Sequence, residues 1–264
     1  MSARCPLRSP VAWVLAACLI AAGLTAGSAA ARTLEQVRAL GVISMCANPD
    51  ALPYSSDKPD APGFQVEIGR ALAQGLGVQL KVEWVVPRRR VAEVNCDMLL
   101  DSVNDPQLYG GRRLLSMPYQ RSGIALALGP AAQGMSGLRD LNAQHRVGVM
   151  VGSLASVVLG KQGVRTSPYA FQADLLEAVE KGLLSGAAVS AQTLGYYLKQ
   201  HPEANIRAVS LFETEPQLAW TVSVGLRNAD PALLDEMNRI IASILADGTI
   251  SGIYARYGVE HHTP

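Results

Sequence analysis

The chain has 264 residues, 17% of them charged, and a formal net charge of +1. This near balance excludes the strong positive field by which proteins gather nucleic acid or an anionic membrane, so we expect no nucleic-acid partner. The sequence has no G-x-S-x-G elbow, P-loop or dinucleotide fingerprint, and its four histidines lack metal-ligand spacing. We therefore expect a binding protein with no metal or cofactor, and not an enzyme.

The first 31 residues have the pattern of a secretory signal peptide. Arg4 and Arg8 precede an apolar run over residues 11–24, and the small residues at 28–31 suit signal peptidase. Cleavage there removes two basic residues and no acidic one, so residues 32–264 carry a net charge of −1. We expect a periplasmic protein, with an uncleaved membrane anchor and a lipoprotein cleaved before Cys18 as alternatives. No later stretch is long and apolar enough to span a bilayer.

The mature chain opens with the pattern of a β-α-β unit. An apolar strand from Val42 runs into a Pro-rich loop, and apolar residues then recur every fourth position from Phe64 to Leu76, where Gly77 predicts the helix end. Residues 78–86 alternate between apolar and polar, as a half-buried strand does. This order predicts a parallel sheet, and such sheets bind ligands at the carboxyl ends of their strands.

A third buried strand opens at Cys96, and the polar segment 101–105 follows it at another carboxyl end. Short polar side chains there suit hydrogen bonds to a ligand, although they also suit a turn. Cys46 lies near the end of the first strand and Cys96 at the start of the third, and in adjacent parallel strands these ends lie apart. We therefore favour two buried thiols over a disulfide, which an oxidising compartment would permit.

The rest of the chain reads as a crossover, a second β-α pattern and a return. A strand at 123–128 is followed by small residues up to Gly137, which we interpret as the crossover. Further elements are expected as strands at 146–151, 186–191 and 218–227, helices at 172–182 and 193–200, and a loop up to Pro168. Asp230-Pro231 then predicts the start of a long amphipathic helix. Two modules joined twice predict two lobes: residues 32–126 with 219–264, and residues 127–218.

The order of these features resembles periplasmic solute-binding proteins of family 3, the ABC-transporter type. The resemblance rests on Pro53-Tyr54 in the first loop, Gly63-Phe64 at the first helix and the ending ADGTISGIYARYGV, and it covers nearly all of the mature chain. It implies an α/β fold of the type II periplasmic-binding class, with two lobes of mostly parallel sheet flanked by helices and two hinge crossovers. It also implies a monomer that captures a small-molecule ligand by lobe closure for an ABC permease.

The chain departs from this family at three positions that hold an amino-acid ligand. Tyr109 aligns with the arginine that clamps the ligand carboxylate, and Arg112 and Arg113 follow a few residues later. The acidic partner of the ligand ammonium falls near Ala191, and the covering aromatic aligns with Ala51. An ordinary amino acid would bury two charges without partners, so we expect a different small polar solute.

Other segments resemble the quinoprotein-dehydrogenase-associated branch of the family. They are CANPDALPYSS, the Pro-Arg-Arg pattern after the second strand, CDMLL and MPYQRS, whereas DSVNDPQLYGG replaces the branch's usual Gly-Val-Pro-Ala-Gly-Tyr stretch. The branch implies a periplasmic quinoprotein dehydrogenase as partner. The arginines at 88–90 could then meet an acidic ligand or partner, or form a solvated loop.

We predict five ligand contacts from their places at strand ends: Tyr54, Ser102, Asn104, Ser153 and Gln192. Ser153 follows Gly152 and opens a helix, so this terminus either offers free N–H groups to a ligand or is capped by the serine itself. Trp84 and Trp220 are expected in the core or hinge.

Two alternative functions remain open. One is a dehydrogenase accessory that docks a partner and delivers no solute. The other is a lyase on the same scaffold, similar to cyclohexadienyl dehydratase, which needs a carboxylate in the cleft as general acid. Its candidates are Glu67, Asp101 and Glu215.

Overall fold

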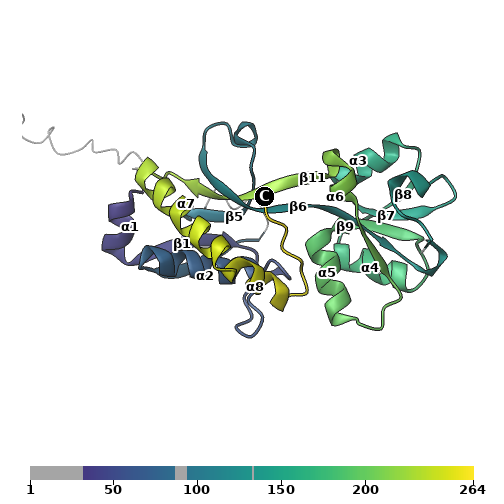
Figure 1. The fold of residues 1–264 in the computed structure, drawn as a ribbon, viewed down its shortest axis with the longest axis horizontal. Coiled ribbons are helices and arrows are strands. Elements are labelled where there is room, and N and C mark those ends of the chain that lie inside the picture. Colours follow the sequence, from purple (N-terminus) through teal and green to yellow (C-terminus); the bar gives the residue numbers. More distant parts are fainter. Residues whose placement is uncertain (1–31, 87–93, 133) are drawn as a thin grey trace, which may run out of the picture. The chain divides into compact units, whose positions relative to one another are not determined.

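The computed structural model describes residues 32–86, 94–132 and 134–264. The predicted signal peptide and the arginines at 88–90 lie outside the described residues. Residues 31–264 form one compact unit, in which helices flank a mixed β-sheet (Figure 1). The α/β class predicted from the sequence is confirmed. Within the described part of the chain, no helix is long and apolar enough to cross a membrane.

Strands and helices alternate through much of the chain. The strands are β1 (Val42–Ala47), β2 (Asp50–Ala51), β3 (Ser55–Ser56), β4 (Gln79–Trp84), β5 (Met98–Val103), β6 (Arg113–Leu128), β7 (Arg146–Met150), β8 (Arg165–Tyr169), β9 (Gly186–Ser190), β10 (Arg207–Ser210) and β11 (Ala219–Arg227). The helices are α1 (Leu34–Leu40), α2 (Phe64–Leu76), α3 (Leu154–Lys161), α4 (Gln172–Glu180), α5 (Ala191–Gln200), α6 (Leu211–Thr214), α7 (Pro231–Ala246) and α8 (Thr249–Arg256). The main sheet has the order β4-β1-β5-β11-β6-β9-β7-β8, with β10 on β6.

The first β-α-β unit forms as its sequence predicts. β1 pairs in parallel with β4 along its whole length, and α2 follows β1 and leads into β4. Gly77 ends α2 in the left-handed conformation at φ 75°, which favours glycine. Because β4 lies at the edge of the sheet, Trp84 keeps 41% of its surface exposed instead of entering the core.

β6 and β11 carry the sheet across its middle. β11 pairs antiparallel with both β5 and β6, and β6 changes partner from β11 to β9 between Gly123 and Ile124. The crossover expected at residues 129–137 is therefore wrong, because the 16-residue strand β6 itself passes from one set of partners to the other. Pairing with β11 also extends β5 to Val103, so residues 101–103 belong to the strand instead of following it.

The far end of the sheet contains a strand that the sequence analysis missed. β7 pairs in parallel with β9 and with β8, which occupies the stretch expected to be a loop. Pro168 is tolerated inside β8 because an edge strand does not need every N–H for pairing. α4 forms as predicted and buries Leu175, Leu176 and Val179.

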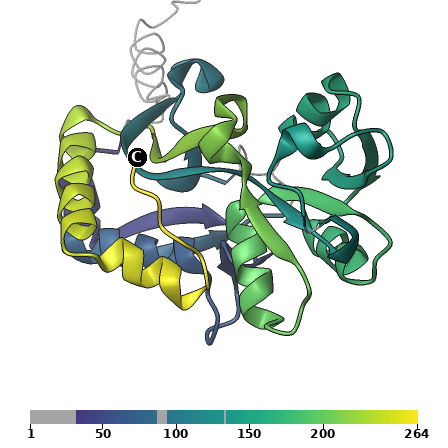
Figure 2. The same ribbon diagram turned by 45° about the vertical axis from the view of Figure 1, so that its right-hand side comes forward.

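Among the described residues, the buried apolar side chains form three clusters. The first has its buried members within residues 37–119 and 224–259, and the other two have theirs within residues 124–218. α7 starts at the predicted cap, where the Asp230 side chain accepts a hydrogen bond from the Leu233 N–H at 2.8 Å. Its apolar stripe packs with α8 and α2 in the first cluster (Figure 2).

Cys46 and Cys96 form a disulfide, so the expectation of two free thiols is wrong. Their Cα atoms lie 5.6 Å apart, within the range that a bridge tolerates. The reason is the register of the sheet: Met45 lies beside Met98, so the start of β5 is level with the end of β1.

Candidate functional site

A cavity of about 630 Å³ lies where the three apolar clusters meet. Its lining comes from the end of β1 and the following loop, from β5, β6 and β11, and from residues 150–154 and 188–192. The polar and charged lining side chains are those of Asn48, Tyr54, Ser55, Gln65, Asp101, Tyr119, Gln120, Ser122, Ser153, Gln172, Ser190, Gln192, Trp220 and Tyr254. Of the described lining residues, Asp101 is the one with a formal charge.

The loop after β1 is held against the first turn of α2. The N–H groups of Phe64 and Gln65 donate to the carbonyls of Pro53 and Tyr54, both at 2.9 Å. Gly63 lies at φ 89°, and a Cβ there would come within 2.4 Å of the Tyr54 carbonyl oxygen. The loop can approach this closely because residue 63 has no side chain. The Tyr54 ring also packs on Phe64, with centroids 5.0 Å apart.

The pleat of β5 decides which of its side chains reach the cavity. Leu99, Asp101 and Val103 line it, at every second position. Ser102 points to the opposite face, where it is 1% exposed and accepts a hydrogen bond from Arg113 at 3.4 Å. Asn104 also lies outside the lining, and its backbone N–H donates to the Thr221 carbonyl. Among the candidate residues on β5 or just after it, Asp101 is therefore the one whose side chain reaches the cavity.

The opposite wall is built by the starts of two helices. Ser153 caps α3, because its hydroxyl accepts a hydrogen bond from the Ser156 N–H at 3.2 Å, and it also lines the cavity. Ser190 caps α5 in the same way, through the Thr193 N–H. Gln192 follows in the first turn of α5, is 3% exposed and also lines the cavity.

Two hydrogen bonds join the walls of the cavity. The Tyr54 hydroxyl donates to Ser190 Oγ at 2.7 Å, and Ser122 Oγ donates to Gln192 Oε1 at 3.1 Å. The structure thus brings together three of the five predicted contacts: Tyr54, Ser153 and Gln192.

Gln120 is a cavity residue that the sequence analysis did not select. It is 2% exposed, and its Oε1 accepts a hydrogen bond from the Tyr254 hydroxyl. Its Nε2 is buried and has no hydrogen-bond partner among the described residues. A buried amide donor left unpaired costs about 1–3 kcal/mol, and most buried polar groups in folded proteins have a partner. Gln120 lies in the segment MPYQRS, which resembles the family branch. That resemblance does not indicate which side chain of the segment faces the cavity.

Two buried tyrosines pack beside Gln120. Burial is the main cause that raises the pKa of Tyr119 above its usual range, and the nearby Asp101 carboxylate adds to the shift. Burial also raises the pKa of Tyr254, with Tyr119 contributing. Both hydroxyls therefore stay protonated at neutral pH. The Tyr119 hydroxyl donates to the Leu100 carbonyl.

The residues near the missing amino-acid anchors do not supply a substitute in the described lining. Tyr109 lies outside the cavity, and its hydroxyl donates to the Val103 carbonyl at 3.2 Å. Arg113 stacks over the Tyr109 ring, 4.6 Å from its centroid, and Arg112 is exposed. Trp220, expected in the core or hinge, packs against the second apolar cluster and also lines the cavity.

Of the three carboxylates considered for acid catalysis, Asp101 lines the cavity and the other two do not. Glu67 ties α2 to the C-terminal helix, because it pairs with Arg256 and accepts a hydrogen bond from the Tyr257 hydroxyl at 2.6 Å. Glu215 accepts a hydrogen bond from the Gln217 amide at 2.8 Å.

Curated relatives of this chain are named as enzymes. Membrane-bound lytic murein transglycosylase F of Pseudomonas savastanoi pv. phaseolicola is 27% identical over 244 residues, which cover 85% of this chain and 47% of the relative. The protein of the same name from Pseudomonas fluorescens is 26% identical and covered to 48%. The chain thus spans about half the length of the curated relatives it matches. These names overturn the expectation that the chain is simply not an enzyme.

Solved structures of solute-binding proteins share the fold. An ancestral cationic amino-acid solute-binding protein matches 85% of this chain and 99% of its own, with a TM-score of 0.74 and 18% identity. The unliganded, open L-cystine solute receptor of Neisseria gonorrhoeae matches 88% of this chain and 98% of its own, with a TM-score of 0.71 and 16% identity. These neighbours confirm the predicted periplasmic-binding-protein fold. Residues 43–260 also match the family as a whole, and the chain belongs to the bacterial extracellular solute-binding proteins, family 3.

Proposed function

We propose that this chain captures a small polar solute in the cavity at the meeting of the three apolar clusters, in the periplasm. The observation that carries the proposal is a cavity with polar side chains on two opposite walls and an unpaired amide donor between them. Cavities of this size and lining are typical of small-molecule sites. Family membership supports the same reading.

Capture works by closure of two lobes. The lobes are residues 32–126 with 219–264, and residues 127–218. The apolar clusters separate close to this boundary, since the buried members of the second and third begin at Ile124 and Ala125. Tyr54 and Ser190 belong to different lobes, and their hydrogen bond is a contact that exists only while the lobes are close. A ligand that touches both walls adds contacts in the closed state alone, and so shifts the population toward it.

The Gln120 amide lines the cavity, and in this proposal it turns on binding so that its buried Nε2 meets a hydrogen-bond acceptor of the ligand. Tyr54, Ser153 and Gln192 are the predicted contacts that line the cavity with it. Tyr109 takes the place of the arginine that clamps the ligand carboxylate in amino-acid binders, and it lies outside the described lining. We therefore expect a polar solute other than a standard amino acid.

A thermal-shift screen of the full chain tests this function, with organic acids, alcohols, sugars, murein fragments and amino acids as the panel. A ligand at a hundred times Kd adds about 2.7 kcal/mol to the free energy of unfolding. For any hit, Gln120→Ala should weaken binding about tenfold, since the lost bond is worth about 1–3 kcal/mol. Gln74→Ala, at an exposed position of α2, is the matched control and should bind as the parent does. No hit across the panel, or equal affinity in both variants, would refute the proposal.

An enzyme acting on the captured ligand is the second candidate. The names of the curated relatives favour it, and Asp101 is the carboxylate positioned to serve as a general acid. In this reading Asp101→Asn keeps ligand binding but abolishes turnover of murein or of the screened ligand. Turnover that survives this substitution would exclude Asp101 as the acid.

A link to a periplasmic quinoprotein dehydrogenase is supported by sequence resemblance alone, in CANPDALPYSS, MPYQRS, CDMLL and the Pro-Arg-Arg pattern. The first two of these segments also bear on ligand capture. Their side chains Tyr54 and Gln120 line the cavity, so the same segments can serve ligand capture. Co-sedimentation of the full chain with a purified quinoprotein dehydrogenase, compared with its sedimentation alone, tests this partner. A permease partner is tested in the same way with an ABC permease in detergent.

A further inference from the structure

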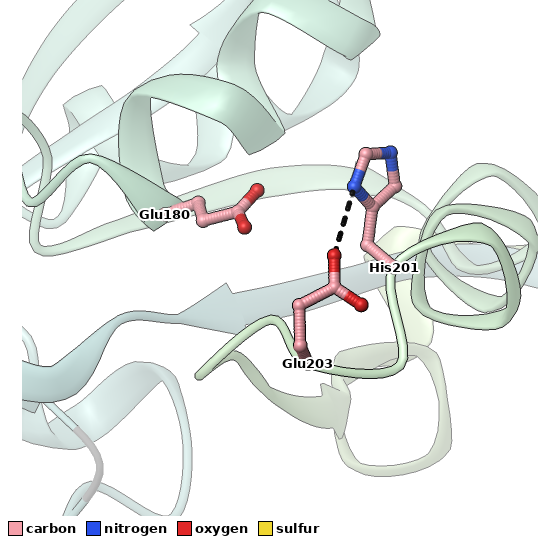
Figure 3. A group of neighbouring side chains, drawn as sticks. All are labelled: Glu180, His201 and Glu203. Atoms are coloured by element: carbon pink, nitrogen blue, oxygen red, sulfur yellow. Dashed lines mark ion pairs between the residues drawn. The ribbon is translucent and has the colours of Figure 1, made fainter.

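A side-chain cluster away from the cavity has the composition of a metal site. It consists of Glu180, His201 and Glu203, and one ligand atom from each lies within 4.8 Å of the other two (Figure 3). None of the three lines the cavity described above. We propose that this cluster binds one borderline divalent transition-metal ion, of which Zn²⁺ is the representative, through one imidazole nitrogen and two carboxylate oxygens.

The C-terminal ends of two helices bring the ligands together. Glu180 is the last residue of α4, and His201 is the C-cap of α5, where its N–H donates to the Tyr197 carbonyl at 2.9 Å. Pro202 then prevents the helix from continuing, and the chain turns so that Glu203 comes back beside His201. The Glu203 carboxylate lies 3.8 Å from His201 Nδ1.

Tyr197 positions two of the three ligands. Its hydroxyl donates to Glu180 Oε2 at 2.5 Å, which leaves Oε1 for an ion. Its ring stacks on the His201 imidazole, with centroids 4.2 Å apart and planes at 13°. An outer residue that orients the ligands in this way is typical of metal sites.

Glu203, the third ligand, is exposed enough to move toward the other two. Three donors bound to one ion at about 2.1 Å lie about 3.4 Å apart in a tetrahedral arrangement, closer than in this structure. The Glu203 side chain is 71% exposed, so a change of rotamer toward the other two meets no packed neighbour. Solvent then takes the fourth position.

The local charge and the donor set favour this class of ion. Glu177 lies beside the cluster but is paired with Lys181 at 2.9 Å, so Glu180 and Glu203 remain to balance a cation. The imidazole nitrogen favours Zn²⁺ and similar transition metals, whereas Ca²⁺ and Mg²⁺ prefer a shell made of oxygen ligands alone.

Calorimetric titration of the full chain with Zn²⁺ in a buffer that does not chelate metals tests the proposal. We expect one site, and His201→Ala should weaken its affinity at least about tenfold. His145→Ala, in the half-buried turn before β7, is the matched control and should leave the affinity unchanged. Zinc held by the tail histidines His261 and His262 would make the His201→Ala variant bind as the parent does, and that result would overturn the proposal.

Cobalt spectroscopy tests the positioning role of Tyr197. Bound Co²⁺ should give visible absorption bands of a four-coordinate site, and these should be lost in Glu203→Gln. Tyr197→Phe keeps the stacked ring but removes the hydroxyl, so it should change the Co²⁺ spectrum and weaken Zn²⁺ binding about tenfold. Melting of each variant without metal separates these effects from misfolding. A parent-like spectrum in Tyr197→Phe would show that Tyr197 does not orient the site.

Discussion

Replacing Gly63 with alanine should destabilise the protein far more than a typical surface substitution. The backbone at this residue has φ 89° and ψ 150°, a region open almost only to glycine. A Cβ would also lie 2.4 Å from the Tyr54 carbonyl oxygen and 2.6 Å from Ser55 Cα, both of them backbone atoms that a side-chain rotation cannot relieve. The substitution therefore combines backbone strain with a steric clash.

The magnitude follows from these two parts. Backbone strain of this kind costs about 1–3 kcal/mol, and overpacking costs about 1–3 kcal/mol. Alanine returns about 0.4–1 kcal/mol by restricting the unfolded chain. The expected loss is about 3 kcal/mol, which lowers the melting temperature by about 6–12 °C in a domain of this size. Ligand binding should weaken too, because the displaced loop carries Tyr54.

Gly77→Ala is the matched control for this experiment. Gly77 also has a positive φ, 75°, but no atom lies within 4 Å of the place its Cβ would take. It should therefore cost only the left-handed strain, about 1 kcal/mol. Urea unfolding followed by circular dichroism measures both variants. If Gly63→Ala loses no more than Gly77→Ala, the clash with the loop is not real and the reasoning fails.

Three further predictions concern stability. Replacing both cysteines of the Cys46–Cys96 bridge, which are 50 residues apart, with serine should remove about 4 kcal/mol of the free energy of unfolding, measured in urea; a loss below about 1 kcal/mol would contradict the loop-entropy account. The raised pKa of Tyr119 means that the folded state favours its protonated form. Its contribution to the free energy of unfolding is therefore complete below the usual tyrosine pKa of about 10, and this contribution is lost as the pH rises above that value. Tyr119→Phe should therefore flatten the loss of stability between about pH 9 and 11 in pH-dependent melts, and an unchanged slope would argue against this assignment. Glu67→Gln should lower the free energy of unfolding by about 1–2 kcal/mol, since its carboxylate accepts a charge-assisted hydrogen bond from Tyr257. Thermal melting of this variant, of Tyr257→Phe and of the double variant should show that the two losses are not additive.

Local signals in the sequence were sufficient for most of the elements. Gly77 and the Asp230 cap marked helix ends because each does its work within a few residues of its own position. The Pro53-Tyr54 and Gly63-Phe64 pairs were informative for the same reason, since they form one local contact between a loop and a helix start. β8 was missed because Pro168 suggests a loop, and whether a strand lies at an edge depends on the rest of the sheet.

The wrong expectation for Cys96 and the position of Ser102 on the face away from the cavity have one physical origin, the register of β5. No residue near β5 states which part of β1 or β11 it will lie beside, because those partners are far away in sequence. An offset of a few residues decides whether two cysteines meet, and an offset of one exchanges the two faces of a strand. The ligand side chains at strand ends are therefore the part of the site least accessible to sequence reasoning. That is why Gln120, which faces the cavity, is recognisable as a candidate for ligand contact only from its neighbours in the sheet.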